Sequence, residues 1–128
     1  MAKITVVDDD TEFAENVSQL LRNEGFSVNL YYDIEGMIDE LIRNMPDLLI
    51  LDVMFPENPS GGFDLAREIR KTERIKNLPI ILLTAINQEF PMDFSSKDID
   101  PAWMPVQDFV EKPVQMGELV TKIKKLLP

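Results

Sequence analysis

The chain has 128 residues, of which 45% are hydrophobic, a size and composition typical of one globular domain spanning residues 1–128. Acidic residues outnumber basic ones by 23 to 13, and the net charge of −10 disfavours direct binding to nucleic acid or to an anionic membrane. Cysteine and histidine are both absent, which excludes disulfides, thiolate metal sites and Ser-His catalysis. We see neither a signal peptide nor an apolar run of membrane-spanning length, so we expect a cytoplasmic protein.

The first predicted strand covers residues 3–7, an apolar-rich run that ends at Asp8 and Asp9. Asp10 is a good N-cap for the helix predicted next, because its side chain can accept a backbone N–H of the first turn. Apolar residues then recur at helical spacing until Gly25, which is expected to end the helix in a left-handed conformation.

The second strand is predicted over residues 27–31, where polar and apolar residues alternate as in a half-exposed edge strand. Asp33 is expected to cap a second helix, whose apolar face extends to Met45. The four apolar residues 48–51 then predict a strand that is buried on both faces and ends at Asp52.

The second half of the chain continues the alternation of helices and strands. It contains in turn a predicted loop (53–62), a helix (63–69), a strand (80–83), an irregular stretch (85–105), a weak strand (108–111) and a helix (119–127). In the irregular stretch we expect one short helix and a long loop. Thr84 and Lys112 follow directly after the last two predicted strands.

Strict alternation of strand and helix predicts a parallel sheet with helices on both faces, so the carboxyl ends of all strands share one edge. Five polar side chains are expected to meet there, namely Asp8, Asp9, Asp52, Thr84 and Lys112. Three crowded carboxylates repel one another unless a cation is present, and an all-oxygen ligand set favours Mg²⁺. A hydroxyl and an ammonium beside such an ion suit a phosphoryl group, and an aspartate can itself form an acyl phosphate.

Four short motifs carry a resemblance to a known family. They are Val-Val-Asp-Asp at 6–9, Leu-Asp-Val-Met-Phe-Pro at 51–56, Leu-Thr-Ala at 83–85 and Glu-Lys-Pro at 111–113. As a set, spread over the whole chain, they resemble the receiver domain of two-component response regulators. The resemblance implies a doubly wound, flavodoxin-like (βα)5 fold with strand order 2-1-3-4-5.

The resemblance also implies a role for each site residue. Asp52 would accept a phosphoryl group from a histidine kinase or phosphotransfer protein, and Thr84 and Lys112 would hold it. The Mg²⁺ ligands would be Asp8, Asp9, Asp52 and the backbone carbonyl of Met54. Phe109 occupies the position of the family's switch aromatic and would act together with Thr84. The bond between Lys112 and Pro113 is expected to be cis.

Two segments depart from the family pattern. The loop over residues 57–62 is longer than usual, and residues 88–106 lack the usual pattern of the fourth helix, which leaves the output surface, the downstream protein target and homodimer formation open. Met54 and Ile86 are apolar at positions where polar side chains often orient water, so we hypothesise slow self-dephosphorylation.

Two other classes of function remain as alternatives. The Asp8-Asp9-Asp10 run loosely resembles haloacid dehalogenase-like phosphatases, in which Asp8 would be the nucleophile and Asp10 the general acid, but Glu12 stands where a hydroxyl residue is usual. A receiver-like module that is never phosphorylated is the other alternative. The preferred interpretation is a signalling receiver, which catalyses its own phosphoryl transfer and is not a turnover enzyme.

Overall fold

Five strands form one parallel sheet in the order β2-β1-β3-β4-β5, which confirms the predicted fold class and topology. The computed structural model describes residues 2–56, 58, 60–84 and 106–127. The strands are β1 (Lys3–Val7), β2 (Ser27–Tyr31), β3 (Leu48–Asp52), β4 (Ile80–Thr84) and β5 (Asp108–Glu111). The described helices are α1 (Thr11–Asn23), α2 (Met37–Arg43), α3 (Gly61–Lys71) and α5 (Met116–Leu126). The short helix expected within residues 85–105 lies outside the described residues.

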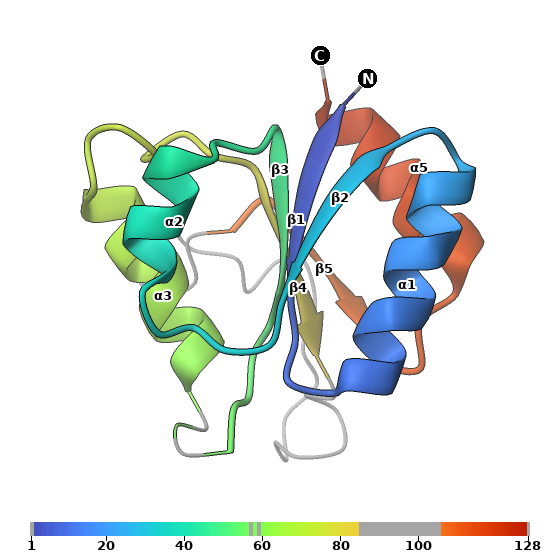
Figure 1. Cartoon of the computed structure of the whole chain (residues 1–128), viewed down its shortest axis with the longest axis horizontal. Coiled ribbons are helices and arrows are strands. Elements are labelled where there is room, and N and C mark those ends of the chain that lie inside the picture. The colour runs from blue at the N-terminus through green and yellow to red at the C-terminus, as the bar shows by residue number, and fades with distance from the viewer. Residues whose placement is uncertain (1, 57, 59, 85–105, 128) are drawn as a thin grey trace.

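The sheet lies between two helical layers, with α1 and α5 on one face and α2 and α3 on the other (Figure 1). All residues of β3 and β4 are buried, because these strands lie in the middle of the sheet with a helical layer on each side. The edge strand β2 is only partly buried, as its alternating sequence predicts. None of the described helices is long and apolar enough to span a membrane.

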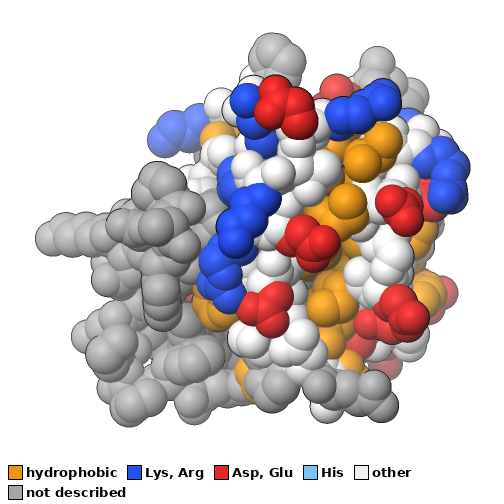
Figure 2. Space-filling model, turned by 90° about the vertical axis from the view of Figure 1, so that its left-hand side faces the viewer, with side chains coloured by type: hydrophobic (Ala, Val, Ile, Leu, Met, Phe, Trp, Pro, Cys, Tyr) orange, Lys and Arg blue, Asp and Glu red, His pale blue; other side chains and the backbone are white. Residues whose placement is uncertain are grey.

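The face formed by α2 and α3 carries a stripe of hydrophobic side chains flanked by charged ones (Figure 2). Ile38 and Ile42 of α2 are half-buried against the core beneath the helices. Half-buried apolar side chains such as these fix α2 to the core and leave part of their own surface exposed.

The start of α1 agrees with the sequence, whereas both ends of α2 differ from it. The Asp10 carboxylate accepts the N–H of Phe13 at 3.1 Å, as predicted for an N-cap. The prediction that Asp33 caps α2 is wrong: it accepts the N–H of Ile34 instead, and the helix begins only after Gly36, whose φ of 75° is left-handed.

The prediction that the apolar face of α2 extends to Met45 is wrong, because the helix ends at Arg43. Met45 precedes Pro46, and a residue before proline is disfavoured in the helical conformation. Its side chain is therefore outside the helix and 41% exposed. At the end of α1, by contrast, Gly25 has the predicted left-handed conformation, with φ of 98°.

Gln107 fixes the start of β5. Its side-chain oxygen accepts the N–H of Ile80 at 2.7 Å and a guanidinium N–H of Arg70 at 2.8 Å. Arg70 also donates to the carbonyl oxygen of Leu78 at 2.8 Å. These contacts join α3, β4 and β5 near the amino ends of the strands, opposite the edge at which the predicted site residues lie.

Candidate functional site at the carboxyl edge of the sheet

Three carboxylates meet where β1 and β3 end. Asp8 and Asp9 follow β1 directly, Asp52 is the last residue of β3, and one oxygen of each lies within 4.8 Å of the others. Asp8 and Asp52 are buried. The structure therefore brings together the three acids that the sequence placed at this edge.

Backbone N–H groups orient the two buried carboxylates. Asp8 Oδ1 accepts the N–H of Asp10 at 2.9 Å, and Asp52 Oδ1 accepts the N–H of Val53 at 2.9 Å. These two contacts fix the orientation of the Asp8 and Asp52 carboxylates.

Lys112 supplies the positive charge of the site. Its Nζ lies 2.9 Å from Asp8 Oδ2 and 3.5 Å from Asp52 Oδ1. Its backbone N–H donates to the carbonyl oxygen of Thr84 at 2.8 Å, which ties the end of β5 to the end of β4. The bond between Lys112 and Pro113 is cis.

The charges of the site act unequally on its members. The pKa of Asp52 is raised to about 7. Burial is the largest cause, the negative charges of Asp8 and Asp9 act in the same direction, and Lys112 opposes them. Burial lowers the pKa of Lys112, but its hydrogen bond to Asp8 and the charges of both acids leave the pKa raised overall. Among the described residues of the site, negative charge thus exceeds positive charge, and an additional cation would relieve the excess.

Thr84 and Phe109 complete the predicted set. Thr84 is the buried last residue of β4, the strand next to Asp52. Phe109 lies in β5 opposite Leu82 and is partly buried against the core beneath α2 and α3. Within the run Asp8-Asp9-Asp10, the third aspartate differs from the other two, because its carboxylate caps α1 instead of joining the cluster.

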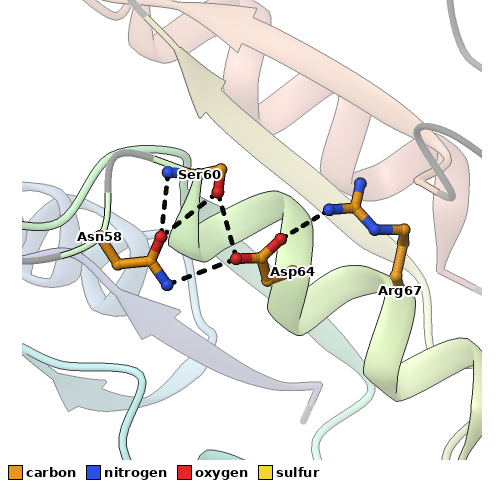
Figure 3. A network of polar contacts seen from close by, with 4 residues as sticks. All are labelled: Asn58, Ser60, Asp64 and Arg67. Atoms are coloured by element: carbon orange, nitrogen blue, oxygen red, sulfur yellow. Dashed lines mark hydrogen bonds and ion pairs between the residues drawn. The ribbon is translucent and has the colours of Figure 1, made fainter.

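The long loop after Asp52 is closed by its own hydrogen bonds. Phe55 and Asn58 exchange two backbone hydrogen bonds of 3.1 and 3.0 Å. The Asp64 carboxylate then accepts from Ser60 Oγ at 3.1 Å and from Asn58 Nδ2 at 3.3 Å, and it pairs with Arg67 at 2.6 Å (Figure 3). This network anchors the loop that carries the Met54 carbonyl to the first turns of α3.

Sequence reasoning missed three contacts around the site. Phe13, assigned only to the apolar face of α1, lies under the Lys112 ammonium, with 4.6 Å between Nζ and the ring centroid. Gly62 packs against the backbone of Asp52, and Lys122 of α5 donates to the carbonyl oxygen of Phe109 at 2.8 Å. The Gly-Gly pair that opens α3 was the one signal of a close backbone approach.

Comparison with known proteins identifies the fold and the family. The chain is 37% identical to the regulatory protein VanRc of Enterococcus gallinarum, over 98% of this chain and 49% of that protein. It is 35% identical to the transcriptional regulatory protein CpxR of Escherichia coli K12, over 99% of this chain and 50% of that protein. The chain thus spans about half the length of these curated relatives.

Solved structures show the same architecture. A putative response regulator from Chloroflexus aurantiacus superposes with a TM-score of 0.81 at 30% identity, covering 98% of this chain and 96% of that one. The chemotaxis protein CheY4 of Vibrio cholerae shares the fold with a TM-score of 0.81 at 24% identity, covering 99% of both chains. The sequence profile of the response regulator receiver domain matches residues 4–124. The chain therefore belongs to the response regulator receiver domain family.

Proposed function

We propose that this receiver domain accepts a phosphoryl group on Asp52 from a histidine kinase or phosphotransfer protein, in a reaction that requires Mg²⁺. One observation carries the proposal: the Asp8, Asp9 and Asp52 carboxylates converge within 4.8 Å, and the Lys112 ammonium contacts two of them. Such a set can bind a hard cation and the oxygens of a phosphoryl group at the same place.

The residues present fit a magnesium ion. Carboxylate and carbonyl oxygens are the ligands that Mg²⁺ prefers, and the excess negative charge around Asp52 favours its binding. Asp8, Asp9, Asp52 and the backbone carbonyl of Met54 would hold the ion. When bound, Mg²⁺ supplies positive charge that offsets the charge of the phosphoryl oxygens.

In the proposed transfer, a carboxylate oxygen of Asp52 attacks phosphorus. A P–O bond forms while the P–N bond of the donor phosphohistidine breaks, and its electron pair stays on the imidazole nitrogen. Lys112 Nζ and the Thr84 hydroxyl donate hydrogen bonds to the peripheral phosphoryl oxygens, whose charge they stabilise. Val53 N–H and Lys112 keep the attacking carboxylate oriented before the donor arrives.

The output of this reaction is a changed protein-binding surface. We propose that the Thr84 side chain moves toward the bound phosphoryl group and that the Phe109 ring moves with Thr84. The two residues lie on the adjacent strands β4 and β5. The occupant of the surface would be a downstream protein or a second copy of the chain. Phosphorylation would shift an equilibrium between two arrangements of this surface.

The test is to incubate the chain with acetyl phosphate and Mg²⁺ and to measure its intact mass. We expect a gain of one phosphoryl mass, mapped to Asp52 and absent from Asp52→Asn or when a chelator removes Mg²⁺. Glu15→Gln, at an exposed carboxylate of α1, is the matched control and should be labelled like the wild type. An unlabelled wild type would favour the module that is never phosphorylated.

The phosphatase alternative makes a different prediction, namely turnover of a phosphate ester that depends on Asp8 and Asp10 and not on Asp52. The Asp10 carboxylate accepts the N–H of Phe13, an arrangement that does not present it as a general acid.

Slow self-dephosphorylation remains a prediction. It rests on two apolar residues, of which Met54 is described and Ile86 lies outside the described residues. A phosphoprotein lifetime of seconds would contradict it.

A further inference from the structure

Among the described residues, the ammonium of Lys112 contacts an aromatic ring as well as two carboxylates. Besides the carboxylates of Asp8 and Asp52, Nζ faces Phe13, at 4.6 Å from the ring centroid. A cation within about 6 Å of an aromatic face is attracted by the negative electrostatic potential of that face. Lys112 is thus held by two charged groups and one neutral group.

The neutral neighbour differs from the other two in one respect. Asp8 and Asp52 belong to the carboxylate cluster proposed to bind Mg²⁺, so a bound cation competes with Lys112 for their charge. The ring of Phe13 does not bind Mg²⁺, and its attraction for the ammonium persists when the carboxylates are engaged. A lysine has a flexible four-carbon stem, so an anchor that remains in place limits the positions that Nζ visits.

Phe13 is itself fixed relative to the site. Its N–H donates to Asp10 Oδ1 at 3.1 Å, and the N–H of Asp10 donates to Asp8 Oδ1 at 2.9 Å. The ring is half-buried against the core beneath α1 and α5. In Figure 1 α1 starts immediately after β1, at the edge of the sheet where the site lies. The ring therefore sits on a rigid first turn that is hydrogen-bonded to the carboxylate cluster.

We propose that Phe13 is a positioning residue for phosphoryl transfer, whose ring face keeps the Lys112 ammonium beside Asp52 when a divalent cation occupies the carboxylates. This inference rests on the proposed function of Lys112 and Asp52. It assigns a role to the electrons of the ring, and not only to the volume of the side chain. A purely packing role for Phe13 predicts that ring size matters and ring electrons do not.

The test separates electrons from volume. Phe13 in the full chain is replaced by 4-fluoro-, 3,5-difluoro- and 3,4,5-trifluorophenylalanine, which withdraw electrons from the ring face with little change of size. The rate of Asp52 phosphorylation by acetyl phosphate is measured at saturating Mg²⁺. A small donor is used because a protein donor could touch the half-exposed ring. We expect the rate to fall stepwise with each fluorine, by about three- to tenfold over the series.

Matched controls exclude a general effect of fluorine. The same substitutions at Phe26, which is also half-buried on this core but follows the other end of α1, should leave the rate unchanged. Mg²⁺ affinity, measured by calorimetry, should stay constant throughout the Phe13 series. A flat series at Phe13, or equal effects at Phe13 and Phe26, would overturn the inference.

A second measurement does not depend on phosphorylation. The ring should shift the NMR signals of the Lys112 Cε protons upfield, and Phe13→Leu should remove that shift with and without Mg²⁺. Loss of the shift when Mg²⁺ is added to the wild type would contradict a persistent anchor. Absence of any label on the wild type would overturn the proposed function, whereas a labelled wild type with a flat fluorine series would overturn the role of Phe13 alone.

Discussion

Gly62, at the start of α3, packs directly against the backbone of Asp52: a Cβ on the glycine would overlap the Asp52 carbonyl oxygen and lie 2.7 Å from Val53 Cα. The N–H of Gly62 donates to the carbonyl oxygen of Val53 at 2.8 Å. The chain that carries the proposed acceptor and the helix that follows it are therefore in backbone contact, which only a residue without a side chain permits.

Gly62→Ala should accordingly lower the free energy of unfolding by about 1–3 kcal/mol, because neither backbone can move away without breaking hydrogen bonds. Urea denaturation followed by circular dichroism measures the change. Gly117→Ala is the matched control: a Cβ there meets nothing within 4 Å, and alanine should stabilise this helical position by about 0.5–1 kcal/mol. Equal effects of the two substitutions would contradict the close approach at Gly62.

The stability of the metal-free chain should fall as the pH rises from about 4 to about 7. The pKa of Asp52 is raised from 3.8 to about 7, so in this range the folded state retains a proton that the unfolded state has lost. Asp52→Asn removes this dependence and should raise the melting temperature at pH 8 by several degrees, with no gain below pH 4. Thermal unfolding of both proteins in chelator across this pH range tests the prediction. A rise in melting temperature that is the same at every pH would contradict the raised pKa of Asp52.

Lys122→Met should loosen β5. The Lys122 ammonium donates to the Phe109 carbonyl oxygen at 2.8 Å and to Asp108 Oδ1 at 3.2 Å, and it lies 5.6 Å from the Phe109 ring centroid. Losing these contacts should destabilise the fold by about 1–2 kcal/mol. Lys125→Met, at an exposed lysine of the same helix, should have little effect. NMR linewidths of the Phe109 ring protons would show whether the ring gains motion only in the first variant.

Asp64→Asn should weaken the network that closes the loop after β3. The carboxylate binds Arg67 and accepts from Ser60 and Asn58, all near the surface, so a loss of only about 0.5–1 kcal/mol is expected. Hydrogen exchange should nevertheless accelerate at the amides of Phe55 and Asn58. Glu68→Gln, at an exposed residue of the same helix, is the control, and matching exchange in both variants would count against the network.

The sequence predicted those parts of the fold that depend on local pattern. Apolar runs gave the strands, and parallel strands place their carboxyl ends together, so the meeting of Asp8, Asp52 and Lys112 could be foreseen. The start of α2 could not, because Asp33 and Gly36 both suit a helix start and the choice depends on the local backbone. The Phe13–Lys112 contact joins residues almost a whole chain apart, and no local pattern reports such a pair.

The contacts of Gln107 also have a consequence for protein engineering. Because Arg70 and Ile80 set the register of β5 at Gln107, the position of Lys112 is fixed by residues on either side of the 85–105 interval. Closing a longer connection between two fixed ends costs little additional entropy. An insertion within this interval should therefore leave the register of β5, and with it the position of Lys112, set by the contacts of Gln107.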